Sequence, residues 1–117
     1  MPIIRANTGV VTQINVFTVV PERQAELVSV LKEATVIARE VPGWISASVH
    51  KSYDGTQVTN YAQSTSHETW DLMMDKLFKA GIIERLNEIA TPAPKLYECV
   101  YTLEEPDADA IVSQKHP

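Results

Sequence analysis

The sequence predicts one α+β domain built on a four-stranded antiparallel sheet, and three observations lead to this prediction. Residues 10–20 are rich in Val, Ile, Thr and Phe, which are typical of strands. Residues 44–50 alternate in period two, and residues 58–63 run back after Asp54-Gly55, a strong hairpin turn signal. Helical spacing of apolar residues follows the first strand and the hairpin, so the predicted order is strand, helix, strand, strand, helix, strand.

This order is the split-βαβ arrangement of ferredoxin-like folds. Right-handed crossovers place the first and third strands at the centre of the sheet and both helices on one face. The last strand is expected over residues 96–103. Because the first and last strands are also apolar on the uncovered face, we expect two chains to pack sheet against sheet as a homodimer.

The helix boundaries follow from local signals. The first helix is expected to begin at Pro21, where a missing N–H costs little, and to end before Pro42. The second helix is expected to begin with a capping box in which Thr65 is the N-cap. Gly81 ends it, and a short third helical piece follows over residues 82–90.

The length of 117 residues suits one domain with a single hydrophobic core. We expect an N-terminal arm over residues 1–9, the domain over residues 10–104 and a C-terminal tail without a periodic pattern over residues 105–117.

Charge and composition exclude several classes of function. The net charge of −5, without any run of Lys and Arg, argues against nucleic acid or an anionic membrane as a partner. The N-terminus has no signal-peptide pattern, and no apolar segment approaches the roughly 20 residues of a membrane span. Cys99 is the only cysteine, so an internal disulfide is excluded and a reducing compartment fits. We therefore expect a cytoplasmic protein.

Asn60 draws attention because Asn is depleted in strand centres and a buried amide needs either a hydrogen-bond partner or a function. Asn15 lies near the middle of the first strand, which neighbours the third strand in this topology. The two amides can meet, or can point together into a pocket between sheet and helices. Buried amides that simply satisfy each other are the alternative interpretation and carry about equal weight.

The other candidates give weaker signals. His50 is expected on an edge strand, His67 at a helix start and His116 in the tail, and their spacing fits no metal site. No Gly-rich phosphate loop and no nucleotide or flavin fingerprint is present, so we expect neither a cofactor nor a metal. A pocket wall is the alternative to a core role for three residues of the second helix: Trp70, Met73 and Met74.

Three stretches resemble the antibiotic biosynthesis monooxygenase domain: residues 11–19, the Val41-Pro42-Gly43-Trp44 junction and residues 54–63. The resemblance covers nearly the whole predicted domain. It implies a dimeric α/β barrel, in agreement with the split-βαβ order. The enzymatic members oxidise polyphenolic, anthrone-like substrates to quinones with molecular oxygen and without metal or flavin, and relatives in the same superfamily degrade haem.

The resemblance also implies site residues. In quinone-forming members, an Asn on the first strand and an Asn on the third line the pocket, with a Trp four residues after the second Asn. Asn15 and Asn60 match the two Asn and are the predicted catalytic residues, whereas Ser64 stands at the Trp position. Trp70 is the candidate for the aromatic wall. The predicted substrate-binding residues are Phe17, Ala62, Ser64, Trp70, Met73 and Met74.

The resemblance implies a cofactor-independent monooxygenase that holds a small aromatic substrate, polyketide-like or quinol, and lets it react with molecular oxygen. Its contribution is orientation and stabilisation of an anion by amide donors. No general base is assigned, because no His or carboxylate lies on the faces of Asn15 and Asn60. A non-catalytic small-ligand-binding or stress-associated protein of this fold is the alternative, which Ser64 favours, and a haem-binding or haem-degrading protein is the third.

Overall fold

The computed structural model describes residues 2–115 and confirms the predicted order of strands and helices. Beyond that order it adds a 3-10 turn, η1, before α1 and a C-terminal helix, α4. The elements are β1 (Val11–Thr18), η1 (Pro21–Arg23), α1 (Gln24–Ala38), β2 (Trp44–Lys51), β3 (Gln57–Ser64), α2 (His67–Lys79), α3 (Ile82–Ile89), β4 (Pro94–Tyr97) and α4 (Ala108–Lys115).

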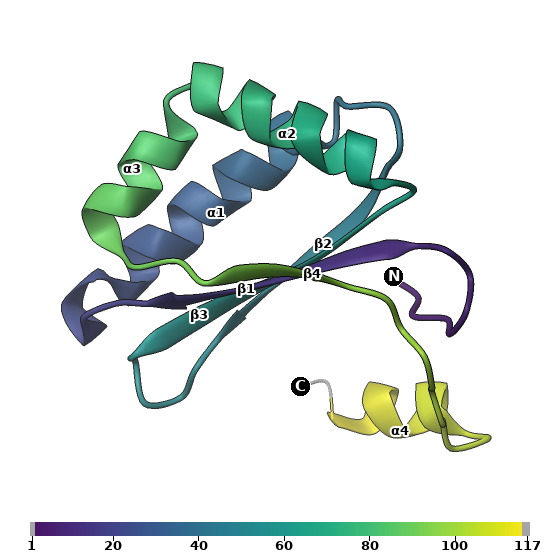
Figure 1. Cartoon of the computed structure of the whole chain (residues 1–117). Coiled ribbons are helices and arrows are strands. Elements are labelled where there is room, and N and C mark those ends of the chain that lie inside the picture. Colours follow the sequence, from purple (N-terminus) through teal and green to yellow (C-terminus); the bar gives the residue numbers. More distant parts are fainter. Residues whose placement is uncertain (1, 116–117) are drawn as a thin grey trace.

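The sheet has the order β2-β3-β1-β4 with antiparallel neighbours, so the first and third strands are central, as predicted. Helices α1, α2 and α3 cover one face and leave the other face open (Figure 1). In the central pair, Asn15 lies directly opposite Asn60. Residues directly opposite each other in an antiparallel pair point to the same face of the sheet. The strand order and the helix layer on one face confirm the predicted ferredoxin-like α+β fold.

The core lies between the helices and the covered face of the sheet. One buried cluster joins β1, β3 and the three helices through Phe17, Leu31, Val58, Leu77 and Ile82. A second, smaller cluster lies at the other end of α1 and contains Val11, Ala38, Val41, Ala62, Trp70 and Met73. No helix among residues 2–115 is both long and apolar enough to cross a bilayer.

The prediction of a last strand over residues 96–103 is wrong in its bounds, because β4 covers only Pro94–Tyr97. Pro94 can begin this strand since β4 is an edge, where a missing N–H removes no ladder bond on the outer side. Beyond Tyr97 the chain leaves the sheet, and the carbonyl of Cys99 accepts a hydrogen bond from the backbone N–H of Asn7 at 2.9 Å. The N-terminal arm thus lies against the segment that follows β4.

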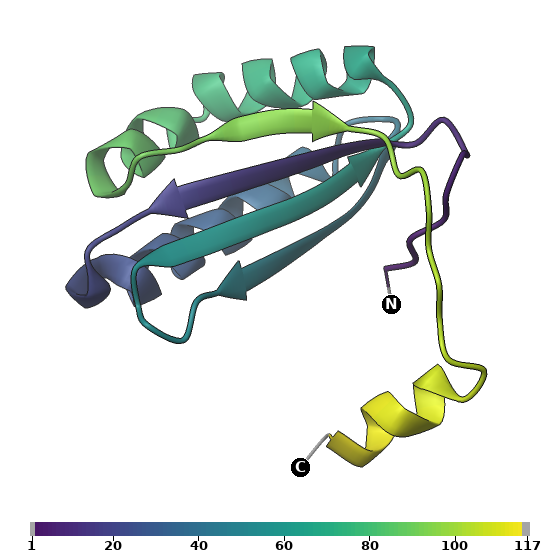
Figure 2. The same ribbon diagram turned by 60° about the horizontal axis from the view of Figure 1, so that its bottom comes forward.

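The region predicted as a tail contains α4, which has no buried residue. This helix stands apart from the three-helix layer, on the side of the open sheet face (Figures 1 and 2). The division of the chain at residues 9 and 104 remains a prediction. Met1 and the last two residues, among them the predicted tail residue His116, lie outside the described part of the chain.

Asp54 organises the β2–β3 turn through its carboxylate. Its Oδ1 accepts hydrogen bonds from the Thr56 hydroxyl at 2.7 Å, the Thr56 N–H at 3.0 Å and the Ser52 hydroxyl at 2.8 Å. These bonds favour the charged form and lower the pKa of Asp54 below its ordinary value, with the Thr56 hydroxyl as the largest cause. Side-chain hydrogen bonds therefore stabilise the predicted hairpin turn in addition to Gly55.

The entry to α2 differs by one residue from the prediction, since Ser66 rather than Thr65 is the N-cap. The Ser66 hydroxyl accepts the backbone N–H of Thr69 at 3.2 Å. Gly43, which ends the α1–β2 connection, packs against this turn and has a φ of +96°. A Cβ at this position would overlap the hydroxyl oxygens of Thr69 and Thr65.

We therefore expect Gly43→Ala to destabilise the fold. The positive φ costs about 1 kcal/mol for an L side chain, and the overlap with two hydroxyls adds to it, so the free energy of unfolding should fall by about 2–3 kcal/mol. Gly81→Ala is the matched control, because Gly81 has a φ of +78° but no atom within 4 Å of the added Cβ. Equal losses for the two variants in urea unfolding would show that the contact with α2 is unimportant.

Candidate functional site

A cavity of about 40 Å³ lies between the covered face of the sheet and helices α1 and α2. It has room for a few water molecules, each of which needs roughly 10–15 Å³ on this measure. The small side chains of Ala34, Ala38, Ala47 and Ala62 leave this space open. Its lining residues are Gln13, Ala34, Thr35, Ala38, Trp44, Ala47, Asn60, Ala62, Trp70, Met73, Met74 and Leu77.

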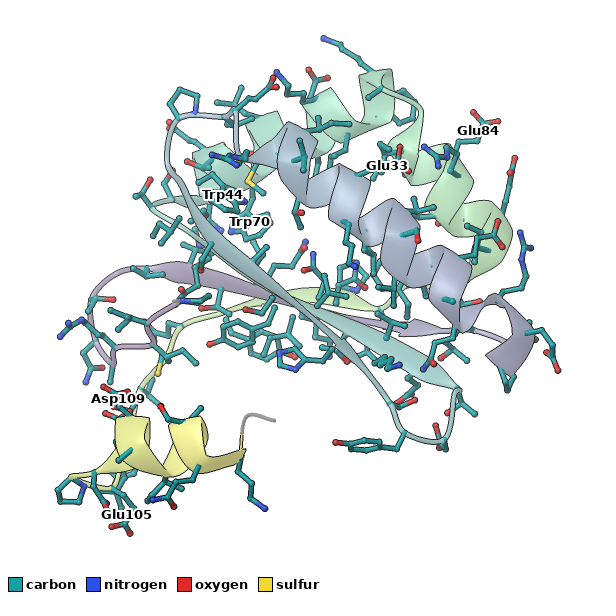
Figure 3. The ribbon with its side chains drawn as sticks, turned by 180° about the vertical axis from the view of Figure 1, so that it is seen from behind. Glu33, Trp44, Trp70, Glu84, Glu105 and Asp109 are labelled. Atoms are coloured by element: carbon teal, nitrogen blue, oxygen red, sulfur yellow. The ribbon has the colours of Figure 1, made fainter. Side chains whose placement is uncertain are left out.

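Trp44 reaches the cavity because of an irregularity in β2. The β2–β3 register shifts between Trp44 and Ser46, so that Trp44 lies opposite Ser64 and Ser46 lies opposite Gln63. A β-bulge of this kind re-aims the side chains on one side of the extra residue. Without it, strict alternation would place Trp44 with Ser46 and Ser48 on the open face. Figure 3 shows the side chains of Trp44 and Trp70 between sheet and helices.

Three buried polar atoms on residues that line the cavity have no hydrogen-bond partner among residues 2–115. They are Nε1 of Trp44, Oδ1 of Asn60 and Nε1 of Trp70. All three residues line the same cavity. Buried polar groups are usually paired, and an unpaired one is costly, so three around one space indicate a site that bonds to a ligand or to water.

The predicted site residues fall into two groups. Five of them line the cavity: Asn60, Ala62, Trp70, Met73 and Met74. Three lie elsewhere. The Oδ1 of Asn15 accepts the backbone N–H of Ala93 at 3.0 Å. Phe17 is packed in the larger core cluster, and fully buried Ser64 donates its hydroxyl to the carbonyl of Ser66 at 3.1 Å.

Sequence reasoning did not select Trp44 or Gln13 as site residues. Gln13 shares the covered face with Asn60, because Gln13 pairs with Ala62 across β1 and β3. Trp44 was assigned to the alternating strand, and no sequence signal marks the bulge. The sequence signal for Trp44 is that it is one of only two tryptophans and directly follows Pro42-Gly43.

The electrostatics of the cavity are simple, since none of its lining residues is ionisable. The shifted pKa values belong to groups elsewhere. On the outer helix surface, the hydrogen bond from Arg85 lowers the pKa of Glu33, and the one from Arg23 lowers the pKa of Glu26. His50 and His67 are exposed, and no cluster that can hold a metal ion occurs within residues 2–115. The cavity can therefore orient a ligand and hydrogen-bond to it, but it contains no acid or base.

Comparison with known proteins gives a consistent result, although no family model matches the chain. Over 74 residues it is 42% identical to tetracenomycin-F1 monooxygenase of Streptomyces glaucescens, and the match covers 62% of this chain and 66% of the relative. The monooxygenase from the gene ActVA-Orf6 of Streptomyces coelicolor, solved with nanaomycin D, is 27% identical, with a TM-score of 0.69 over 83% of this chain and 92% of that one. The chain is thus similar to monooxygenases of antibiotic biosynthesis in both sequence and fold.

SnoaB of Streptomyces nogalater, a cofactor-independent oxygenase, supports the fold. Its structure has a TM-score of 0.73 and 24% identity, and the match covers 84% of this chain and all of SnoaB. The chain spans 66% of the length of tetracenomycin-F1 monooxygenase, which is just under two thirds. The fold that surrounds the cavity is therefore shared with SnoaB.

The roles of the two Asn residues should separate in stability measurements. Asn60→Leu should leave the free energy of unfolding unchanged or raise it, because it removes a buried acceptor that has no partner. Asn15→Ala should lower it by about 1 kcal/mol, because the N–H of Ala93 loses its acceptor. Urea unfolding of both variants checks this. A loss above about 2 kcal/mol in Asn60→Leu would identify Asn60 as a structural amide.

Proposed function

We propose that the protein is a cofactor-independent monooxygenase that oxidises an aromatic polyketide-like or quinol substrate with molecular oxygen. The observation that carries this proposal is the cavity in which three buried polar atoms, on Trp44, Asn60 and Trp70, have no partner among residues 2–115. Two N–H donors and one acceptor suit a substrate that carries both a carbonyl or phenolate oxygen and a hydroxyl group. The likeness of the chain to tetracenomycin-F1 monooxygenase and to the ActVA-Orf6 monooxygenase supports oxygen chemistry at this cavity.

The proposed reaction balances with substrate and oxygen alone. A methylene group between two aromatic rings loses a proton to water and becomes a carbanion conjugated with the ring oxygens. This carbanion gives its electrons to O₂ and forms a peroxide anion at the same carbon, which takes back a proton from water to become a hydroperoxide. Loss of water from the hydroperoxide leaves a carbonyl, so that CH₂ and O₂ become C=O and H₂O. The substrate supplies all the electrons.

The chain's contribution is orientation and charge stabilisation. In this proposal, the indole N–H groups of Trp44 and Trp70 hydrogen-bond the oxygen on which negative charge develops, and the amide of Asn60 binds the neighbouring hydroxyl. These groups do not titrate near neutral pH, so they stay in the required state throughout. The proton that leaves the carbon must reach solvent, because no lining residue can accept it.

The cavity must expand to accept such a substrate. Pockets for drug-sized molecules measure about 300–1,000 Å³, far more than the 40 Å³ present here. Met73 and Met74 lie in the wall, and Met74 is 42% exposed, so it marks the side that opens to solvent. Methionine side chains are flexible and repack easily, which makes this side the entrance in our proposal.

A non-catalytic ligand-binding protein remains the second candidate, and Ser64 favours it. Ser64 is fully buried, bonded to Ser66 and absent from the cavity lining, so the position where quinone-forming members carry Trp gives no aromatic group here. Haem binding is the third candidate, although the lining offers no His, Cys or Tyr to the iron. A Soret band on titration with haemin would support it.

Oxygen consumption separates the first two candidates. Metal-stripped protein mixed with an anthrone or a hydroquinone should consume oxygen faster than buffer, and Asn60→Ala should lower the rate at least about tenfold, because the substrate loses a positioning group. Tyr53→Phe, at the exposed tip of the hairpin, should keep the full rate. Rates no higher than those in buffer, across a panel of such compounds, would contradict the enzyme and favour the ligand-binding protein.

We also propose that the protein is a cytoplasmic homodimer in which two open sheet faces pack together. Ile14 and Tyr61 lie opposite each other at the centre of that face. The chain after β4 adds exposed apolar residues on the same side: Val100, Tyr101 and Leu103. Apolar side chains therefore lie at the centre of the open face and on the chain after β4, where a second copy can cover them.

The dimer predicts a mass of twice 13.0 kDa in light scattering at micromolar concentration. Ile14→Glu should yield the monomer, because two copies would bring unpaired carboxylates into the apolar interface. Val36→Glu is the matched control, since Val36 is exposed on the helix layer and its variant should remain dimeric. A monomeric mass for the unmodified protein would refute the proposed dimer.

A further inference from the structure

The two tryptophans of the chain meet at one cavity although they come from different elements. Trp44 begins β2 and Trp70 lies in the first turns of α2, and these are the only tryptophans in the sequence. The indole N–H of each is buried and has no acceptor among residues 2–115. The site thus contains two unpaired donors of identical chemistry.

The β-bulge in β2 brings Trp44 to the cavity, whereas regular alternation would place it on the open face of the sheet. The bulge between Trp44 and Ser46 directs the indole under the helices and leaves Ile45 with 42% of its surface exposed. A regular strand would have buried Ile45 and exposed Trp44 instead. An exposed Ile and a buried unpaired N–H both cost stability, and such costs concentrate at functional sites.

The chemistry of the donors defines their ligand. An indole N–H can only donate, and it keeps its proton at all relevant pH values, so the pair can serve only an acceptor. A carbonyl or phenolate oxygen has two lone-pair directions and can accept from more than one donor. The Oδ1 of Asn60, on the same cavity, can only accept, and therefore needs a hydroxyl or N–H from the ligand.

We infer that Trp44 is a substrate-binding residue, which together with Trp70 donates hydrogen bonds to a carbonyl or phenolate oxygen while Asn60 accepts from a hydroxyl of the same ligand. The ligand class is a hydroxylated anthrone or hydroquinone with both groups. This inference deepens the proposed function, since it concerns the same cavity, but it describes binding and not oxidation.

Anaerobic calorimetry with 1,8-dihydroxyanthrone tests the inference without turnover. Trp44→Phe and Trp70→Phe keep most of the ring and remove the N–H, so each should weaken binding roughly three- to tenfold. Anthracene, which has the ring system but no oxygen, should lose much less affinity in the same variants. Tyr53→Phe is the matched control on an exposed aromatic ring and should bind both compounds as the unmodified protein does.

In each single-tryptophan variant, fluorescence measures the environment of the one tryptophan that remains. Emission from Trp70 in Trp44→Phe, and from Trp44 in Trp70→Phe, should change when dihydroxyanthrone binds. The inference fails if the unmodified protein does not bind dihydroxyanthrone, or if Trp44→Phe weakens anthracene and dihydroxyanthrone equally, because the ring then acts by packing alone. Binding with the expected pattern but without oxygen uptake would support the inference and refute the oxygenase, so the two failures are distinguishable.

Discussion

The candidate site depends on the pairing of β1 with β3 at the centre of the sheet. This pairing sets Asn15 against Asn60 and Gln13 against Ala62, and it points all four side chains toward the helices. Helices α1 and α2 then cover that face, and small side chains such as Ala34 and Ala62 leave a space. If either strand slipped by one residue, its two side chains of this set would point to the open face.

The same constraint separates residues that build the fold from residues that face the cavity. Asn15 satisfies a backbone N–H of the connection to β4, so its amide holds two segments together. Asn60 lies directly opposite but leaves its carbonyl oxygen without a partner among the described residues. Two chemically identical amides therefore have different environments. Natural proteins retain such unsatisfied groups where function needs them, at the expense of stability.

Much of the fold follows from sequence, because hydrophobic period and turn residues act locally. Alternation and Asp54-Gly55 predict the hairpin, and the strand order follows from handedness. The end of β4 and the helix α4 did not follow, since an edge strand and an exposed helix bury too little to leave a pattern. Within the site, Asn60 was predicted from its poor strand propensity. Trp44 was not, because a bulge breaks the alternation on which the prediction rests.

The central claim is that a ligand satisfies the buried indole donors of the cavity. With two tryptophans in the chain, a proton–nitrogen NMR spectrum contains two indole N–H signals, which Trp44→Phe and Trp70→Phe assign. On addition of 1,8-dihydroxyanthrone under anaerobic conditions, both signals should move downfield as the N–H groups form hydrogen bonds, while the backbone N–H of Tyr53 at the hairpin tip stays in place. Binding seen by calorimetry with both indole signals unmoved would contradict this account of the site.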